Sequence, residues 1–166
     1  MGVTTFAAIY VGSYEVSLKI FEISEKRKIR TVDFIRSRVE LGKDVFHGGG
    51  VGYELVDDVC DVMLEFCGIM DGYRVDAYEA YAGPALYHAA NCLFVLDQIE
   101  RRTGIRLKLL RNSEHRFLSY KCATSKPEFD RMTGESAAFV NVGGGELQIT
   151  LFVHGAVLTT QHLVLG

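Results

Sequence analysis

Long apolar runs are missing from the sequence, and so is an export signal. The longest apolar stretches are short and interrupted, as in CLFVLDQI at residues 92–99, whereas a membrane-spanning helix needs about 20 predominantly apolar residues. The N-terminal MGVTTFAAIY has neither a charged leading segment nor an apolar segment of signal-peptide length. From these absences we expect no membrane partner, and the sequence predicts a cytoplasmic protein.

Positive charge is also scarce. Lys and Arg total 18 against 21 for Asp and Glu, a formal net charge of −3, whereas a dedicated nucleic-acid-binding protein is usually strongly basic. We therefore expect no nucleic-acid partner. One basic run could attract a polyanion, although such residues more often form a solvated face. It comprises Arg101, Arg102, Arg106, Lys108, Arg111 and Arg116.

Cysteine pairs with zinc-ligand spacing are absent as well. The sequence has four cysteines, and no two of them have CxxC spacing. They are Cys60, Cys67, Cys92 and Cys122. Cys60 and Cys67 are seven residues apart, which places them on one face of a helix. Buried free thiols are the prediction, with zinc or a disulfide as the alternative.

The apolar content, 48% of 166 residues, is ample for one large domain or two small ones. Apolar and alternating segments predict three successive antiparallel strands at 4–12, 15–23 and 28–41. A flexible connection is expected at 43–52. Residues 55–66 then carry apolar side chains at helical spacing, with acidic residues on the opposite face, and predict a helix.

The middle of the chain alternates between strand and helix patterns. Residues 73–83 alternate in polarity and predict a central strand, and residues 105–110 predict a short strand. The segment 84–104 begins with proline and ends with glycine, which is the usual punctuation of a helix. We expect it to hold two helical pieces that meet near Asn91.

The last part of the chain predicts a second sheet. A helix at 113–125, capped by Asn112 or Ser113, leads into the polar, irregular segment 126–136. Three strands follow, at 137–142, 146–153 and 156–163. Because a lone exposed sheet is unstable, we expect that the chain ends inside a longer protein, or that this sheet packs on the first domain or on a partner chain.

Six segments carry motifs in a fixed order and spacing. They are FAAIYVGSYEVSLKIFEI (6–23), RVELGKDVF (38–46), YAGPALYHAAN (81–91), TGIRLKLLRNSEHRFLSY (103–120), AFVNVGGGELQITLFVHG (138–155) and HLVLG (162–166). The first resembles a hairpin with Asp-(Ile/Leu)-Gly-Ser-Asn-Ser. The fourth resembles Ser-Gly-x-Glu-Glu-Ala-Arg after a strand, and the fifth resembles Asp-Ile-Gly-Gly-Gly-Ser-Thr-Glu.

Together these motifs resemble the Ppx/GppA phosphatases, the family of exopolyphosphatase and guanosine pentaphosphate phosphohydrolase, over essentially the whole chain. The resemblance implies an α/β fold of the actin-like ATPase (ribonuclease H-like) type. Residues 1–125 would form a first domain with a mixed sheet. Residues 126–166 would form the first strands of a second domain of the same type.

The resemblance also implies phosphoanhydride hydrolysis. In that family, backbone amides of two glycine turns hold phosphates. Carboxylates bind Mg²⁺ and orient or deprotonate the attacking water, and a basic side chain offsets phosphate charge. The phosphate-binding positions that survive in this sequence are Gly12, Ser13, Gly143, Gly144 and Gly145.

Most charged positions of the family are replaced. Tyr10 stands in place of the first aspartate, and Asn141 stands in place of the second. Gln148 replaces the final glutamate of the glycine-rich motif. The Glu-Glu pair aligns with Glu114 and His115, which are therefore the catalytic candidates, and no metal-binding residue is assigned.

Three further replacements add bulk or negative charge. Tyr14 replaces an asparagine, Tyr87 replaces an arginine, and Glu146 replaces a serine, which would push a carboxylate toward bound phosphate. Loss of one well-placed catalytic group costs about two to four orders of magnitude in rate. The sequence therefore predicts weak or absent hydrolysis, with Mg²⁺ implied by the resemblance alone.

Three classes of function stay open. The first is a degenerate homologue that keeps the scaffold and binds polyphosphate or a guanosine polyphosphate, or acts through assembly, with a homodimer as the candidate. The second is an active exopolyphosphatase with Glu114 or His115 as base. The third is a purely structural interaction protein. Residues 143–145 could also be only a hairpin bend, and HGGGVG at 47–52, which looks like another phosphate loop, is expected to be a linker.

Overall fold

The computed structural model describes residues 2–26, 28–125, 128–129, 131, 134–143 and 145–164. The strands are β1 (Val3–Val11), β2 (Glu15–Ser24), β3 (Ile29–Arg38), β4 (Ala77–Ala82), β5 (Lys108–Leu109), β6 (Ser136–Val142), β7 (Glu146–Val153) and β8 (Ala156–Val164). The helices are α1 (Leu41–Gly48), α2 (Tyr53–Gly72), α3 (Pro84–His88), α4 (Cys92–Thr103) and α5 (Asn112–Thr124).

The strands form two sheets. One has five strands in the order β3-β2-β1-β4-β5, and the other has three strands in the order β6-β7-β8. β1 pairs antiparallel with β2 and parallel with β4, so the larger sheet is mixed. Since β1 and β4 are parallel, their carboxyl ends lie at the same edge, where Gly12 and Gly83 follow them. The expected α/β fold with a mixed sheet is confirmed.

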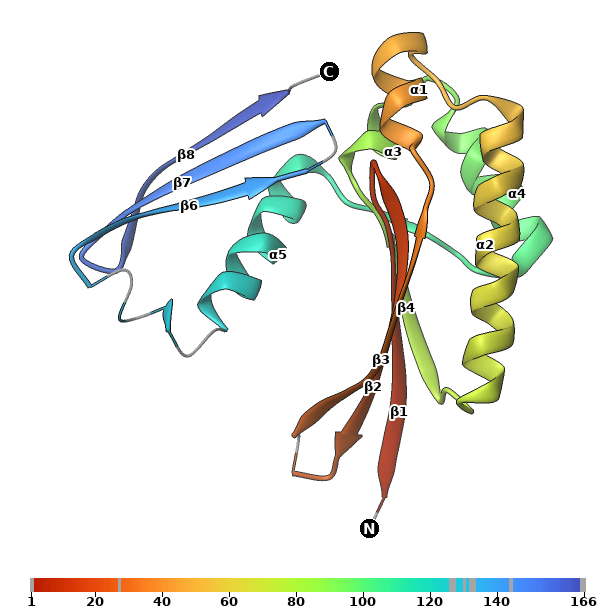
Figure 1. Ribbon diagram of the computed structural model, residues 1–166, viewed down its shortest axis with the longest axis horizontal. Helices are drawn as coiled ribbons and strands as arrows, with labels where there is room; N and C mark the ends of the chain where they lie inside the picture. Colours follow the sequence, from red (N-terminus) through yellow and green to blue (C-terminus); the bar gives the residue numbers. More distant parts are fainter. Residues whose placement is uncertain are drawn as a thin grey trace.

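Alternation along β1 and β2 turns apolar side chains to one face, which α2 and α4 cover (Figure 1). On β1, Ala7, Ile9 and Val11 are buried, whereas the residues between them are not fully buried. α2 contributes apolar residues three or four positions apart, the spacing of one helix face. Its buried residues are Val56, Val59, Cys60, Met63, Phe66 and Met70. This core stabilises a first body, made of β1–β5 and α1–α4.

Two local expectations are wrong. The segment expected to be a flexible connection begins with α1, because Leu41 and Val45 are buried on one side of a helical turn. Gly49 then ends that helix in the left-handed conformation, at φ 74°, which glycine adopts without the Cβ penalty. The cap of α5 is neither Asn112 nor Ser113, since the helix begins at Asn112 and its N-cap residue is Arg111.

The predicted break near Asn91 is confirmed. α3 ends at His88 and α4 begins at Cys92. The Asn91 side chain bonds the backbone of Val51 at both ends: its Oδ1 accepts from the amide over 2.9 Å, and its Nδ2 donates to the carbonyl over 2.8 Å. A carboxamide can satisfy a backbone donor and acceptor at once, so Asn91 fixes the loop before α2.

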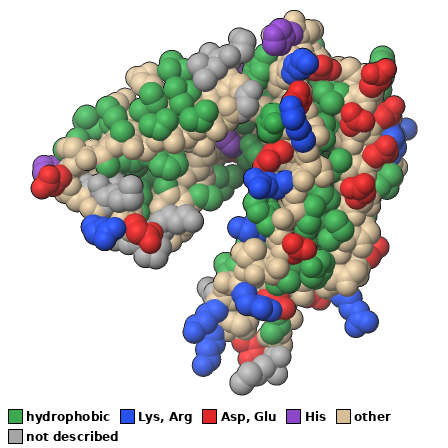
Figure 2. Space-filling view, viewed as in Figure 1, with side chains coloured by type: hydrophobic (Ala, Val, Ile, Leu, Met, Phe, Trp, Pro, Cys, Tyr) green, Lys and Arg blue, Asp and Glu red, His purple; other side chains and the backbone are tan. Residues whose placement is uncertain are grey.

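α5 and the three-stranded sheet form a second body (Figure 1). Tyr120 of α5 stacks on Phe152 of β7 with ring centroids 6.0 Å apart, and Phe129 lies edge-on to both rings. Thus α5, although it precedes the boundary that we propose at residue 125, packs on the second sheet. The opposite face of this sheet is apolar and exposed, and hydrophobic side chains gather there in Figure 2. It includes Val140, Val142, Leu151 and Leu163.

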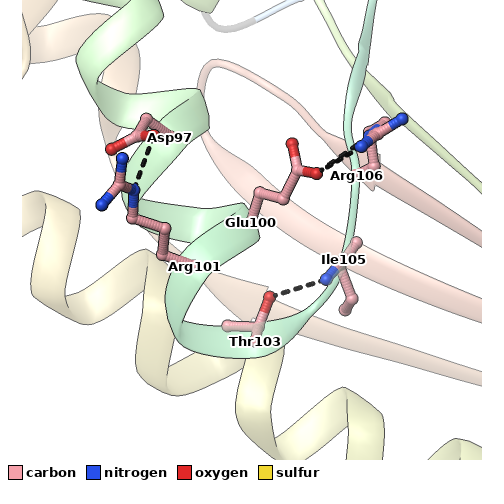
Figure 3. Close-up of polar contacts among 6 residues, drawn as sticks. All are labelled: Asp97, Glu100, Arg101, Thr103, Ile105 and Arg106. Atoms are coloured by element: carbon pink, nitrogen blue, oxygen red, sulfur yellow. Dashed lines mark hydrogen bonds and ion pairs between the residues drawn. The ribbon is translucent and has the colours of Figure 1, made fainter.

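The basic run is largely paired with acids. Figure 3 shows Arg101 with Asp97 and Arg106 with Glu100 near the end of α4, with donor-acceptor distances of 2.8 and 2.7 Å. Arg102 pairs with Asp57, and Lys108 pairs with Glu79 (2.5 Å in both pairs). These exposed pairs agree with a solvated face.

The cysteines are free thiols, and the prediction that they are buried is only partly confirmed. Cys60 and Cys92 are buried, Cys67 is half-buried and Cys122 is exposed. Burial raises the pKa of the Cys60, Cys67 and Cys92 thiols, which disfavours the reactive thiolate.

Within the described part of the chain, no helix is both long enough and apolar enough to cross a membrane.

Candidate functional site

Two hairpin turns that share the same backbone hydrogen bond, between residues three apart, line one cleft. Gly12 follows β1 and donates its amide to the carbonyl of Glu15 over 2.9 Å. Gly143 follows β6 and donates its amide to the carbonyl of Glu146 over 2.8 Å. The cleft between the two bodies has a volume of about 520 Å³. Four predicted site residues line it together: Gly12, Ser13, His115 and Gly143.

The cleft carries carboxylates where a phosphate site would carry cations. Its described lining residues are Tyr10, Gly12, Ser13, Tyr14, Glu15, His115, Asn141, Val142, Gly143 and Glu146, with neither lysine nor arginine among them. The carboxylate of Glu15 lies 3.9 Å from the guanidinium of Arg36 outside this lining. Two carboxylates facing one cleft disfavour a polyanion there.

Tyr10 fills the end of the cleft next to the first turn. Its ring lies against Gly12 and Gly83: an added Cβ would be 3.3 Å from the ring at Gly12 and 2.3 Å from the hydroxyl at Gly83. The hydroxyl lies 3.0 Å from Nε2 of His115. Burial, with a smaller effect of the Glu146 charge, raises the pKa of Tyr10 to about 12. The phenol therefore keeps its proton and can donate a hydrogen bond to Nε2 of His115.

His115 reaches the cleft from the first turns of α5 and contacts Glu146 of β7. Its Nδ1 lies 3.4 Å from Oε1 of Glu146, while Nε2 of His162 on β8 lies 2.8 Å from Oε2 of the same carboxylate. Burial lowers the pKa of His115, although the Glu146 charge acts in the opposite direction and His162 adds to the lowering. At neutral pH we therefore treat His115 as neutral, with its proton on the nitrogen that faces Glu146.

The second turn is filled by the chain's own side chains. Glu146 folds back over Gly143, where an added Cβ would lie 3.0 Å from its Cγ. Phe46 of α1 presses on Gly145, where an added Cβ would lie 1.9 Å from the ring. The space that these glycines leave open is thus occupied from within. Gly144, also predicted as a phosphate ligand, lies outside the described residues.

Glu114 and Gln148 lie away from the cleft. The Glu114 carboxylate accepts the backbone amide of Arg111 over 2.8 Å at the start of α5, a common arrangement at the beginning of a helix. Gln148 is buried and donates from Nε2 to Oγ1 of Thr150 over 3.4 Å. The predicted catalytic role of Glu114 stays a prediction, and the geometry gives it a structural contact.

The donors present do not fit Mg²⁺, which prefers carboxylate and water oxygens in octahedral geometry. Tyr10 offers a protonated phenol and Asn141 an uncharged amide, and Glu146 is already hydrogen-bonded to His162 and lies 3.4 Å from Nδ1 of His115. Among the residues that the structure describes, no group of three His, Cys, Asp or Glu side chains could hold a metal ion. We therefore assign no metal to the cleft.

The sequence did not single out His162 or Phe46, and it treated Glu146 only as a replacement. His162 comes near Glu146 through the pairing of β7 with β8. A register counted from the His-Gly turn at 154–155 would place His162 opposite Leu147, on the other face of the sheet from Glu146. The register shift between Leu151 and Phe152 places His162 opposite Gln148 instead, on the face of Glu146, so the pair had no sequence signal. Phe46 had no sequence signal, because it reaches Gly145 from another body.

Comparison with solved structures confirms the resemblance to Ppx/GppA proteins at the level of the fold. An exopolyphosphatase from Cytophaga hutchinsonii superposes with a TM-score of 0.86 at 21% identity, over 98% of this chain and 51% of its own. The Ppx/GppA family member of Aquifex aeolicus gives 0.74 at 22% identity, over 99% of this chain and 52% of its own. The ethanolamine utilization protein EutJ from Carboxydothermus hydrogenoformans gives 0.55 at 13%, covering 100% of this chain and 54% of its own.

These likenesses establish the actin-like ATPase fold. The chain spans about half the length of these solved structures. No protein-family model matches the sequence. No curated protein matches it either.

Proposed function

We propose that this protein is an exopolyphosphatase-like domain that keeps the phosphate-turn scaffold but hydrolyses phosphoanhydrides weakly or not at all. The observation that carries the proposal is the filling of the turns by the chain's own side chains. Tyr10 lies over Gly12 and Gly83, and Glu146 lies over Gly143. A terminal phosphate would have to displace a half-buried phenol and a hydrogen-bonded carboxylate before it reached the backbone amides.

Charge supports the same proposal. A phosphoryl-transfer site stabilises the charge that develops on the transferred group with cations or preorganised donors. This cleft instead presents Glu15 and Glu146, and its described lining residues include no lysine or arginine. Each carboxylate would oppose the negative charge of polyphosphate at short range. The proposed residual role is binding of a phosphorylated ligand or interaction with a partner.

One contact favours a second candidate, an active phosphohydrolase with His115 as general base. A histidine oriented by a carboxylate is a common base, and His115 is held between Glu146 and the Tyr10 hydroxyl. In this alternative a water molecule in the cleft would lose its proton to Nε2 after Tyr10 moves aside. This is the weaker candidate, because the lone pair of Nε2 already accepts a hydrogen bond from Tyr10 and is not free to take a proton from water.

The test is phosphate release from long-chain polyphosphate with Mg²⁺ at high protein concentration. Its control is the double variant Glu114→Ala, His115→Ala. Release equal in both proteins, near the background of buffer, is the expected result. Release that the double variant abolishes would overturn the proposal in favour of the second candidate.

A binding measurement separates the remaining roles. Polyphosphate and guanosine tetraphosphate are added without Mg²⁺ while the melting temperature is followed. A ligand that binds the native state at 100 times its Kd adds about 2.7 kcal/mol of stability. A rise with either ligand supports a phosphate-binding scaffold. An unchanged melting temperature with both supports an interaction protein.

A further inference from the structure

A partly buried hydrogen bond joins the two bodies at the cleft. Tyr10 lies on β1 of the first body, and its hydroxyl is 3.0 Å from Nε2 of His115 on α5 of the second. The His115 side chain is 16% exposed, so water competes poorly for this bond. We propose that the Tyr10–His115 bond is an acid-sensitive latch, and that protonation of His115 releases it and opens the cleft.

The direction of the hydrogen bonds follows from the neighbours of His115. The carboxylate of Glu146 only accepts, so the Nδ1 that faces it carries the proton. Nε2 is then left with a lone pair toward Tyr10, whose hydroxyl is the donor. His162 donates to the other oxygen of Glu146 over 2.8 Å. These assignments of donors and acceptors can all hold only while Nε2 of His115 is unprotonated.

Protonation of Nε2 would leave two hydrogen-bond donors, its N–H and the Tyr10 hydroxyl, facing each other. Once Nε2 carries a proton, the Tyr10 hydroxyl must turn to accept it, and the phenol proton loses its acceptor. The charged ring would also lie in a poorly solvated seam, which burial disfavours. Separation of the two bodies returns the imidazolium to water and relieves both effects.

The other groups around His115 act in known directions. Glu146 from β7 attracts an imidazolium, and His162 from β8 repels one when it is itself protonated. Glu114, next to His115 on α5, is turned to the backbone of Arg111 and does not face the ring. His88 from α3 lines another pocket, of about 260 Å³, together with Glu146 and His162. The net effect lowers the pKa of His115 below its ordinary 6.5.

The sign of the pH effect follows from that lowered pKa. In the open form His115 is solvated and titrates near 6.5, whereas the closed form binds the proton less readily. The closed form therefore has its full stability above about pH 6.5. It loses stability as the pH falls below 6.5 toward the lowered pKa.

Acid should open the cleft without unfolding the first body. Among the described residues, the first body has no buried charged side chain: the buried polar residues are Gln148 and Thr150, which lie in the second sheet and do not titrate. The second contact between the bodies, Phe46 against Gly145, carries no charge either. Opening should therefore precede any loss of secondary structure.

The experiment is small-angle X-ray scattering of the chain at pH 7.5, 6.5 and 5.5, with far-UV circular dichroism on the same samples. We expect the radius of gyration to rise between pH 6.5 and 5.5 while helix content stays constant. The variant His115→Gln, which cannot titrate, should show no rise. The control His47→Gln changes an exposed histidine that bonds Lys43 of its own helix and should behave as the wild type.

Two results would overturn the latch: a constant radius in the wild type, or an equal rise in His115→Gln. If that variant does not fold, the imidazole carbon–proton signals of the wild type decide. His115 must titrate below 6.5, and the amide signals of Gly12 and Gly143 must shift with the same midpoint. A His115 signal with the midpoint of a free histidine would contradict the proposal.

Discussion

The two bodies differ in which face of their sheet is apolar. In the first, the apolar face of β1 and β2 lies under α2 and α4, and Leu18 and Phe66 are completely buried. In the second, the face toward α5 is largely polar, with Gln148 and Thr150 buried beside Phe152. The opposite, apolar face of the second sheet is exposed.

This difference means that the main apolar core and the histidine groups of the site lie in different bodies. The first body has a continuous apolar core of its own, and hydrophobic burial is the main stabilising contribution to folding. In the second body, the aromatic cluster of Tyr120, Phe129 and Phe152 packs α5 on the sheet. The second body contributes His115 and Glu146 to the cleft and His162 behind Glu146, whereas the first body contributes Tyr10 and Glu15. A polar sheet face here serves the cleft at the expense of packing.

The largest effect should come from the first core. Phe66→Ala, at a fully buried position, should lower the free energy of unfolding by about 3–5 kcal/mol. Phe152→Ala should cost less and should affect only the second body, because a pocket of about 280 Å³ already borders that sheet. Urea denaturation followed by circular dichroism gives both values, with Leu93→Ala on the surface as control. Equal losses for the two phenylalanines would contradict the comparison.

A smaller effect is expected at the contact between the bodies. Gly145→Ala places a methyl group on the ring of Phe46, and such overpacking typically costs about 1–3 kcal/mol. Gly68→Ala is the matched control, since an added Cβ there meets nothing within 4 Å and should be neutral or stabilising. Thermal denaturation measures both. The added variant Phe46→Ala should restore most of the loss, and a failure to do so would exclude this contact as its cause.

The latch itself should contribute less. Tyr10→Phe keeps the ring between Gly12 and Gly83 and removes one hydrogen bond, worth about 0.5–1.5 kcal/mol at pH 7.5. The loss should shrink as the pH falls below about 6.5 toward the lowered pKa of His115, because protonation of His115 removes the acceptor of that bond. Tyr14→Phe, at the same cleft but half exposed, should change stability at neither pH. A pH-independent loss for Tyr10→Phe would separate the bond from the titration of His115.

The smallest effect belongs to the surface pairs of Figure 3. Arg106→Ala removes an exposed ion pair with Glu100, and such pairs contribute about 0–1 kcal/mol. We expect a change below about 0.5 kcal/mol, and addition of 0.5 M salt should abolish it. A double-mutant cycle with Glu100→Ala measures the coupling. A coupling above 1 kcal/mol would show that the α4 end is more than a solvated surface.

Much of the fold could be predicted from local patterns. The alternation of Ile9 and Val11, the helical spacing of Val59 and Phe66, and the proline–glycine punctuation around Asn91 each reflect a period imposed by backbone geometry. α1 was missed because its glycines obscure a short apolar face. The cap of α5 was misplaced because capping depends on where the chain turns, and this is decided by packing.

The candidate site was predictable only in part. The motif resemblance directed attention to both glycine turns and to His115. Gly12, Ser13, Gly143 and His115 line the cleft. Gly145 instead lies against Phe46, and Gly144 lies outside the described residues. The resemblance could not reveal that Glu114 turns to the helix start. Such orientations depend on a fraction of a helical turn, which one sequence does not fix.

The sequence by itself determined the order of the strands and of every helix except α1, the two glycine turns, and the absence of most of the acidic side chains that the Ppx/GppA motifs carry. Each of these is a matter of residue identity or of a period of two to four residues. Only the tertiary structure decided that Tyr10 meets His115, and that Glu146 lies between two histidines. Those contacts join residues 16 to 105 positions apart. The first depends on how one body docks on the other, and the second depends on the register of β7 with β8 and on how α5 packs against that sheet.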